Sequence, residues 1–261
     1  MNKLLLLIII SISTANVCQA QFNLKKAIGA GAKTVKAATL TDKQMAEYVG
    51  GYMEWMDANN PLCKGECPYA VRLANITKNI NDDAINIKAY KVTDVNAFAC
   101  ADGSIRVCAG LMDIMTDQEI LGVVGHEIGH IKNTDSKDAF RRALLTSALR
   151  EGISSAGGTA AKLSSSQLGD LGEAVAKSSY SQKQEYAADE YGYNFLKSHN
   201  ENPWAMAQSF VKLKNMMAEM GADKSNAIQQ LFSTHPDLEK RIEKMEEKLK
   251  EEGIAAPTAA N

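Results

Sequence analysis

The 261-residue sequence has little of what marks a nucleic-acid-binding or polytopic membrane protein. Its 29 lysines and arginines are offset by 31 acidic residues, so the formal charge of -2 gives no broad positive field for nucleic acid. Beyond the N-terminus, no stretch approaches the roughly 20 apolar residues that span a bilayer. No internal repeat is visible, and an apolar fraction of 45% is enough for a buried core. We therefore expect one compact domain without nucleic-acid partners.

The N-terminus has the three parts of a secretory signal peptide. Lys3 supplies a positive start, an apolar run covers Leu4 to Ile12, and Cys18–Ala20 has the small-x-small pattern of a cleavage site. The run is about half of the roughly 20 residues that a membrane-spanning helix needs, which argues against the alternative of a membrane anchor. We expect cleavage, export to the periplasm and a mature chain that begins near Gln21.

Lipid attachment at Cys18 is the second alternative. Bacterial lipoprotein sites have a small residue before the cysteine, and Val17 departs from that pattern. A periplasmic protein is therefore the expectation, with an outer-membrane lipoprotein as the alternative form.

The mature chain keeps an even number of cysteines, which predicts disulfide bonds in an oxidising compartment. They are Cys63, Cys67, Cys100 and Cys108. Asp102-Gly103 has the composition of a two-residue hairpin turn between strands at Val95–Ala101 and Ser104–Ala109.

This hairpin would place Cys100 opposite Ile105 and Cys108 opposite Ala97. The two cysteines would then lie on opposite faces, so at most one reaches the loop that carries the first two cysteines. We favour Cys100 for that bond. A second zinc site held by all four cysteines is the alternative, although their spacing is irregular.

Most of the remaining sequence has helical periodicity. The expected helices cover Leu24–Asn59, Pro68–Ile80, Ser179–His199, Pro203–Met220 and Leu238–Glu252. Residues 85–92 alternate as a half-buried strand, which predicts a small antiparallel sheet with the hairpin. The Ser-, Gly- and Ala-rich stretch 153–171 predicts a mobile loop or a loosely packed helix. The expected fold class is α+β and mainly helical.

The segment HEIGH at residues 126–130 carries the clearest chemistry. A capping box at Thr116 and Glu119 begins an apolar helix that continues through it. Residues four apart share one helical face, so His126 and His130 can bind one metal ion. Glu127 is placed to act as general base towards a water molecule. Such a polar trio within an apolar helix is costly unless it is used.

Two histidines leave a third protein ligand to be found. The extended metzincin motif requires glycine and histidine where this chain has Asn133 and Ser136, which excludes that class. A carboxylate from another helix remains, and Glu185 is the best placed, with Asp189 one turn later able to orient a ligand histidine. The competing helix carboxylates are Glu173 and Glu190.

Four motifs, in order and spacing, resemble one known family. They are NAFA at Asn96–Ala99, HEIGH, EYAAD at Glu185–Asp189, and HP at His235–Pro236 followed by Arg241. From about Tyr52 to Arg241 the chain is similar to the HtpX and CAAX-prenyl-protease family of zinc metallopeptidases, the gluzincins. Residues 96–104 are especially similar to its LoiP-type members, small envelope proteases without transmembrane helices.

The resemblance implies a zincin-like domain with one zinc ion per chain, Glu185 as the third ligand and Asp189 supporting the ligand histidines. It implies an edge strand that binds extended substrate, formed by Asn96, Ala97, Phe98 and Ala99. His235 would lie near the metal, where it stabilises an oxyanion or occupies the zinc in a resting form. The alternative is that His235 has only a structural role, as the residue that precedes Pro236 at the N-terminus of a helix. Arg241 would be structural or support the ligands.

The function that the resemblance implies is an exported zinc endopeptidase acting on unfolded or extended polypeptides in envelope protein quality control. The expected organisation is a signal peptide (1–20), an N-terminal helical segment (21–60), a metallopeptidase domain (61–252) and a flexible tail (253–261). The alternative function is a zinc-stabilised periplasmic chaperone or binding protein with an occluded site, which needs the ligands but no base at Glu127. Two features depart from the family pattern. The mature chain has four cysteines, more than a single family disulfide needs, and Val17 makes the lipidation site imperfect.

Overall fold

The structure is a computed structural model, and it describes residues 40–146, 162–219, 231 and 233–257. The expected signal peptide and Cys18 lie outside the described residues, as do residues 21–39 of the N-terminal segment. Residues Leu40–Asn261 form one compact unit. In its described part, no helix has both the length and the apolar character to cross a membrane.

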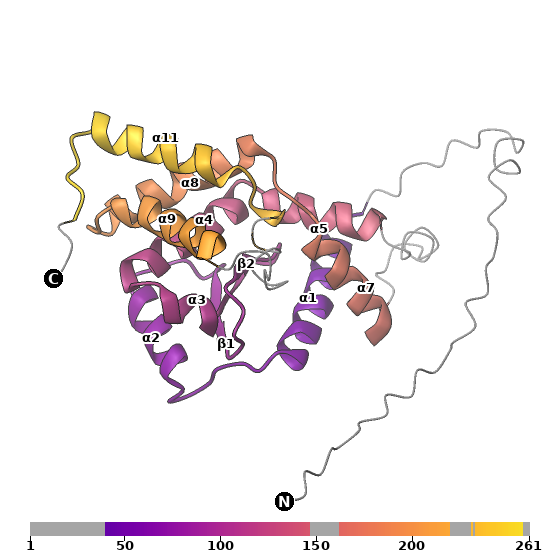
Figure 1. Cartoon of the computed structure of the whole chain (residues 1–261). Helices are drawn as coiled ribbons and strands as arrows, with labels where there is room; N and C mark the ends of the chain where they lie inside the picture. The colour runs from indigo at the N-terminus through magenta and orange to yellow at the C-terminus, as the bar shows by residue number, and fades with distance from the viewer. Residues whose placement is uncertain (1–39, 147–161, 220–230, 232, 258–261) are drawn as a thin grey trace, which may run out of the picture. The chain divides into compact units, whose positions relative to one another are not determined.

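Two helices precede three consecutive short strands, and the other described elements are all helices (Figure 1). The first half contains α1 (Asp42–Asn59), α2 (Pro68–Thr77), β1 (Asn86–Tyr90), β2 (Ala97–Ala99), β3 (Ser104–Cys108), α3 (Ala109–Ile114) and α4 (Asp117–Lys132). The second half contains α5 (Asp135–Thr146), α7 (Ser165–Ala176), α8 (Gln182–Ser198), α9 (Trp204–Glu219) and α11 (Leu238–Glu251). The expected α+β, mainly helical fold is confirmed.

The sheet is mixed rather than wholly antiparallel. Its strand order is β1-β3-β2, with β1 parallel to β3 and β2 antiparallel to β3. Alternation of apolar residues predicted the strand at 85–92 but carries no information on its direction, which the connection sets. Strand β2 is therefore an edge strand, and within the described residues no other strand pairs with its outer side.

The hairpin between β2 and β3 differs by one residue from the predicted register. Ala97 faces Val107, and the Cys100 N–H donates to the Ser104 carbonyl at 2.7 Å, so three residues form the loop instead of two. Gly103 adopts a left-handed φ of 86°, and a Cβ there would lie 1.8 Å from the Ala84 carbonyl oxygen. Glycine is therefore required by both the turn and the close approach of the chain.

The expected disulfide between Cys100 and the first cysteine loop is wrong. Cys63 and Cys67 are bonded to each other, with Cα atoms 5.6 Å apart, and Cys100 and Cys108 are free and buried. Cys63 and Cys100 belong to different hydrophobic clusters, and the hairpin register also changes the faces that the cysteines occupy. Because Cys100 lies opposite Ser104, side-chain alternation along β3 places both free cysteines on the same face of the sheet.

Helix α4 is the centre of the unit. One face packs on the sheet through Ile120, Val124 and Ile128, and the other neighbours of α4 are α8, α9, α5 and α2. Contact with α8 is close because of Gly129, where a Cβ would lie 3.0 Å from the Ala188 Cα atom. In Figure 1, α8, α9 and α11 lie together on one side of α4, and α1, α5 and α7 lie on the other.

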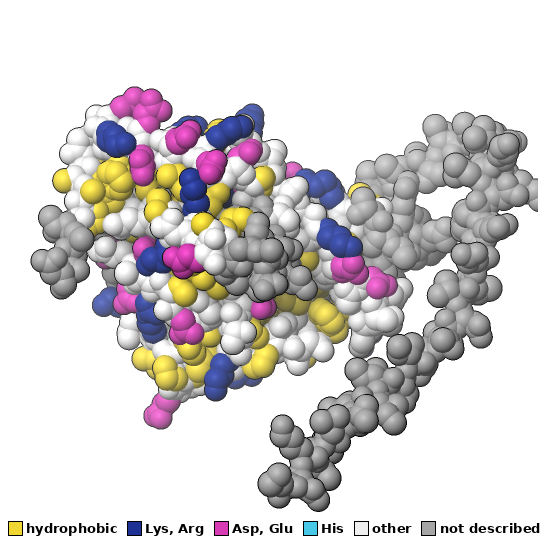
Figure 2. Space-filling view, viewed as in Figure 1, with side chains coloured by type: hydrophobic (Ala, Val, Ile, Leu, Met, Phe, Trp, Pro, Cys, Tyr) yellow, Lys and Arg dark blue, Asp and Glu magenta, His cyan; other side chains and the backbone are white. Residues whose placement is uncertain are grey.

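Helix α1 is joined to the sheet by a polar network. Asp57 accepts hydrogen bonds from Arg106 Nε at 2.8 Å, from Arg106 Nη2 at 3.0 Å and from the Tyr90 hydroxyl at 2.7 Å. Arg106 is only 2% exposed, so its charge depends on this partner. On the face shown in Figure 2, lysines, arginines and acidic residues are interspersed, in agreement with the balanced composition.

The Ser-, Gly- and Ala-rich stretch is partly helical. Its residues 153–161 lie outside the described residues, and α7 begins at Ser165 after a capping box formed by Ser164 and Gln167. The helix packs against α1 and α5.

Candidate metal centre

Helix α4 carries three polar residues on its buried side. Its N-terminus has the expected capping box, in which the Thr116 N–H donates to Glu119 Oε2 at 2.7 Å and the Glu119 N–H donates to Thr116 Oγ1 at 3.3 Å. Further along, His126, Glu127 and His130 are only 5%, 3% and 0% exposed. Burying polar groups without partners costs roughly 2–7 kcal/mol each, so their neighbours identify the site.

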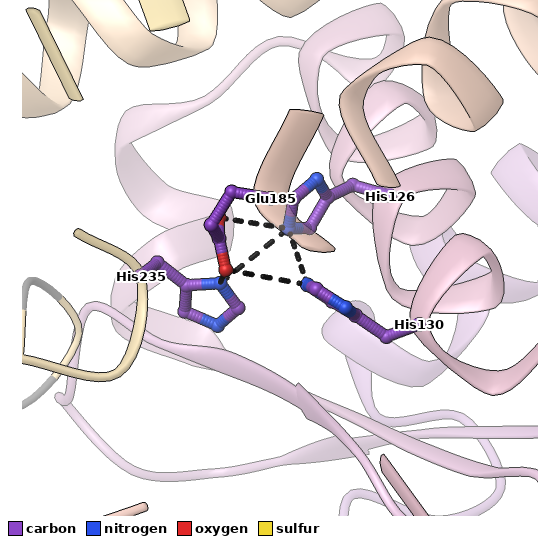
Figure 3. A group of neighbouring side chains, drawn as sticks. All are labelled: His126, His130, Glu185 and His235. Carbon is purple, nitrogen blue, oxygen red and sulfur yellow. Dashed lines mark hydrogen bonds and ion pairs between the residues drawn. The ribbon is translucent and has the colours of Figure 1, made fainter. Parts of the chain in front are cut away.

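Four side chains converge on one point (Figure 3). One ligand-type atom from each lies within 4.8 Å of the others, and the four residues are His126, His130, Glu185 and His235. The Nε2 atoms of His126 and His130 are 3.1 Å apart, and Glu185 Oε1 lies 3.5 Å from His130 Nε2. His235 Nδ1 lies 3.0 Å from Glu185 Oε1. Helix α8 brings Glu185 to the motif, and the segment before α11 brings His235.

The competing carboxylates are elsewhere. Glu173 is exposed on α7 and pairs with Lys177, whereas Glu190 is 49% exposed on α8 and pairs with Lys248. Neither belongs to the group of converging donors among the described residues.

Asp189 and Arg241 hold the His126 side of the cluster. Asp189 Oδ1 lies 2.9 Å from His126 Nδ1. Arg241 donates to Asp189 from Nε at 2.8 Å and from Nη2 at 2.6 Å, while its Nη1 lies 2.6 Å from Glu185 Oε2. Burial lowers the pKa of His126, although Asp189 opposes this shift.

Asp135 and Tyr180 hold the His130 side, and sequence analysis missed both. His130 Nδ1 lies 3.0 Å from Asp135 Oδ2, and Gln184 Nε2 donates to Asp135 Oδ1 at 2.7 Å. Thr134, with a left-handed φ of 63°, turns the chain so that Asp135 reaches back to α4. The Tyr180 ring stacks on His130 with centroids 3.9 Å apart. The sequence feature that could have indicated Asp135 is a carboxylate five residues after His130.

The cluster favours positive charge. Burial alone would lower the pKa of His130, but its contacts with Asp135 and Glu185 raise it to about 9. Burial alone would raise the pKa of Glu185, but His235, His130 and Arg241 hold it well below its usual range. Carboxylates therefore remain ionised around the two histidines, in surroundings that stabilise a cation.

The donor set fits a divalent cation such as zinc. Asp189 and Asp135 face the Nδ1 atoms of His126 and His130, which favours the proton on Nδ1 and leaves the Nε2 lone pairs pointing at each other. With Glu185, acceptors from three residues meet in one buried volume, which a shared cation stabilises. Two imidazoles and one carboxylate are a common ligand set of catalytic zinc.

Glu127 lies beside these donors at a groove. Its Oε1 atom is 3.9 Å from His235 Nε2, and both residues line a groove with a volume of about 580 Å³. The same groove is lined by Asn96, by strand β2, and by residues of α1 and α7. The structure thus brings the predicted edge strand and Glu127 to one cavity. His199, by contrast, is the C-cap of α8 and lies outside it.

A mainly helical α+β fold with an HExxH helix, a carboxylate from a second helix and an adjacent edge strand is the arrangement of the zincin-like class. The family model for peptidase family M48 matches residues 70–249. The chain belongs to peptidase family M48, a family of metalloproteases.

Related proteins agree with this family. Metalloprotease LoiP of Escherichia coli (strain K12) is 36% identical over 95% of this chain and 98% of its own length. Metalloprotease YcaL of the same organism is 34% identical over 95% of this chain and 97% of its own. A protease HtpX homolog of Fusobacterium nucleatum is 28% identical over 61% of this chain and 62% of its own. The chain therefore resembles LoiP and YcaL over almost its whole length.

Proposed function

We propose that the protein is an exported zinc endopeptidase that cleaves extended segments of unfolded polypeptides in the bacterial envelope. The observation that carries this proposal is the placement of Glu127 between a cluster of metal-type donors and a groove bordered by an unpaired strand edge. The coarser function, a metalloprotease, follows from the family.

We assign His126, His130 and Glu185 as the ligands of one zinc ion per chain. A zinc ion bound there would polarise the scissile carbonyl group and make a water molecule a stronger acid. Asp189 and Asp135 orient the two imidazoles, and Arg241 holds Asp189 and Glu185 in place.

Glu127 is assigned as the general base. Its carboxylate accepts a proton from the attacking water and later gives that proton to the leaving amine, so no covalent enzyme intermediate is needed. Glu127 is buried but lines the groove, so its carboxylate can contact both the water molecule and the leaving amine.

His235 is assigned two successive positions. Its Nδ1 atom lies with the ligand atoms, 3.4 Å from His126 Nε2, and this contact supports the assignment of a resting form in which His235 occupies the zinc. With substrate bound, the ring donates a hydrogen bond to the carbonyl oxygen on which negative charge develops, and one such donor is typically worth about 3 kcal/mol.

The outer edge of β2 is assigned as the binding site for the substrate backbone. An extended segment can add to this edge as a further strand, with its side chains alternating between pockets. In folded proteins most strands are already paired and edge strands are commonly protected, so unfolded chains are the substrate class that fits.

The proposal of export rests on the signal-peptide pattern of residues 1–20. In the alternative outer-membrane form, Cys18 is the site of lipidation. The Cys63–Cys67 disulfide supports an oxidising compartment such as the periplasm. We retain the organisation with residues 21–60 as an N-terminal segment, 61–252 as the metallopeptidase domain and 253–261 as a C-terminal tail, although the Ile254 carbonyl oxygen in this tail accepts a hydrogen bond from Trp204 Nε1 at 2.7 Å.

The rival function is a zinc-stabilised chaperone that only holds unfolded chains. Such a protein requires the ligands but no base, whereas Glu127 is present and lines the groove. The two functions separate in an assay with the mature chain and casein. We expect cleavage that a chelator stops and that one equivalent of zinc restores. Binding of casein without any fragments would support the chaperone instead.

A further inference from the structure

Helix α1 forms one wall of the groove that holds Glu127. Its lining side chains include Tyr52, Trp55 and Met56, and strand β2 lines the same groove. The helix lies outside residues 70–249, the part of the chain that the family model matches. Membership of the family therefore assigns no role to α1, although the helix shares a cavity with the proposed general base.

The α1 wall offers an aromatic surface. Trp55 is half-buried, and its ring stacks on that of Tyr52 with centroids 6.4 Å apart. Helix α7 meets this wall with Gly169 and Gly172, and a Cβ at Gly172 would lie 3.6 Å from Trp55 Cζ3. A larger side chain at that position would cover the indole ring. The glycines therefore leave Trp55 open to a chain bound in the groove.

The wall lies towards the end of β2 that is remote from the proposed base. Ala97, the first residue of β2, shares a small cavity with Glu127 and His235. At the other end, Cys100 packs in the same hydrophobic cluster as Tyr52. Antiparallel pairing is slightly the more stable arrangement, and it places the amino end of a bound substrate near Cys100. The α1 wall then faces residues that precede the scissile bond.

A buried ion pair fixes α1 to the sheet beside this wall. Asp57 follows Met56 and accepts two hydrogen bonds from Arg106, at 2.8 and 3.0 Å. In the sheet register, Arg106 lies opposite Phe98 of β2. The Tyr90 ring lies 6.2 Å from that of Phe98, and its hydroxyl donates to Asp57 at 2.7 Å. The network therefore joins α1 to the strand edge on which the substrate would lie.

The chain that follows α1 is also bonded to the sheet. Helix α1 ends at its C-cap, Asn60. Directly after it, the Pro61 carbonyl accepts a hydrogen bond from the Lys91 N–H at 2.7 Å. The Cys63 N–H donates to the Ala89 carbonyl at 2.9 Å. These contacts hold the helix at a fixed distance from the sheet, as a rigid wall of the groove.

We infer that α1 is part of the substrate-binding site, that Trp55 contacts the residues before the scissile bond, and that Asp57 is the positioning residue of this wall. The inference rests on the proposed function and adds a substrate class, long extended segments. A short peptide reaches Glu127 and β2 alone, whereas a longer one also gains the α1 wall. This contact is made in both the ground state and the transition state, so it lowers KM more than it changes kcat.

The test uses quenched fluorescent peptides that share one cleavable core and are lengthened stepwise on the amino side. Mass spectrometry verifies that the cleavage point stays the same. For the wild-type zinc enzyme, kcat/KM should rise by at least about 10-fold along the series, mainly through KM, because one tryptophan contact is commonly worth this much in binding. A second series lengthened on the carboxyl side is the control and should gain less.

Two variants remove the wall in different ways. Trp55→Ala deletes the ring and should lower the long-to-short ratio of kcat/KM by at least about 10-fold. Gly172→Leu covers the ring without deleting any packing, and leucine favours a helix over glycine. It should lower the same ratio. Glu54→Ala is the matched control, because Glu54 is exposed on α1 and does not line the groove.

Asp57→Asn tests the positioning role. This variant should raise KM for the longest peptide relative to the shortest by at least about 5-fold, or about 1 kcal/mol, while the ratio of the two kcat values stays as in wild type. A loss of folded protein would change the rates of both peptides equally. Each ratio compares peptides on one preparation, so partial unfolding does not alter it.

Wild-type rates that do not rise with length on the amino side, or a ratio unchanged in both Trp55→Ala and Gly172→Leu, would overturn the inference while leaving peptide hydrolysis intact. If no peptide were cleaved, the proposed function would fail separately. Binding of the same peptides to Glu127→Gln, measured by fluorescence anisotropy, would then decide the role of α1. Tighter binding of the longer peptides that is lost on adding Trp55→Ala supports it, and equal affinities contradict it.

Discussion

Arg241 and Asp189 form a buried two-point ion pair, with Nε 2.8 Å from Oδ2 and Nη2 2.6 Å from Oδ1. The arginine belongs to α11 and the aspartate to α8, so the pair joins the last helix to the helix that carries Glu185. Burial favours a neutral Asp189, but Arg241 outweighs it and lowers the pKa of that carboxyl group.

Replacing Arg241 by methionine should destabilise the protein, because the carboxylates of Asp189 and Glu185 lose their common partner. Breaking a buried pair typically costs about 3–5 kcal/mol. Urea unfolding of the metal-free protein measures this loss. Lys240→Met, at the exposed neighbouring position, is the control and should change the free energy of unfolding by less than about 0.5 kcal/mol. Equal effects of the two changes would exclude a structural role for the pair.

Asp135 gives a prediction about metal affinity. Asp135→Asn weakens the orientation of the His130 ring, and loss of such a partner typically reduces metal affinity about 10- to 100-fold. Competition with a chromophoric chelator measures the zinc dissociation constant. Asp138→Asn changes an exposed aspartate one turn later and should leave the constant as it is. An unchanged constant in Asp135→Asn would show that this carboxylate does not support a ligand.

Asp57 gives a prediction about acid stability. Burial raises the pKa of Asp57, but Arg106, Tyr90 and Lys88 outweigh it and lower the value to about 2. Because the pKa in the folded protein lies below the usual aspartate value of 3.8, the stabilisation is present above about pH 4 and is lost as the pH falls towards 2.

The Asp57→Asn variant should therefore lose part of this pH dependence. It should also be less stable at neutral pH by roughly 1–3 kcal/mol, because buried Arg106 keeps only part of its hydrogen bonding. Chemical unfolding between pH 2 and 7 measures both effects. Asp83→Asn, at an exposed position, is the control. The same slope in Asp57→Asn and wild type would contradict the assignment.

The cysteines give a prediction about thiol content. Alkylation of the mature chain, denatured without reductant, should label Cys100 and Cys108 and leave Cys63 and Cys67 unlabelled. In the folded protein, burial raises the pKa of the Cys100 and Cys108 thiols to about 12, so labelling at pH 8 should be slow. Peptide mapping identifies the labelled positions. A peptide that joins Cys100 to either Cys63 or Cys67 would show the pairing expected from sequence.

The sequence specified the local parts of the site better than its long-range parts. His126, Glu127 and His130 follow from helical periodicity alone, whereas Glu185 needed a resemblance to separate it from Glu173 and Glu190. Asp135 and Tyr180 reach His130 only through the connections around α4 and α8, which no periodic pattern describes.

In the sheet, too, the sequence predicted local features better than long-range ones. Asp102-Gly103 indicated a hairpin, yet one additional loop residue shifted the register and changed which faces the cysteines occupy. The parallel pairing of β1 with β3 depends on a crossover that the alternation at 85–92 does not encode.

The most direct test of the central claim compares Glu127→Gln with the wild-type mature chain for both zinc content and casein cleavage. We predict one zinc ion per chain in each protein and a cleavage rate at least about 100-fold lower in the variant, because the ligands are intact and the base is lost. Cleavage at the wild-type rate by the zinc-loaded variant would contradict the account.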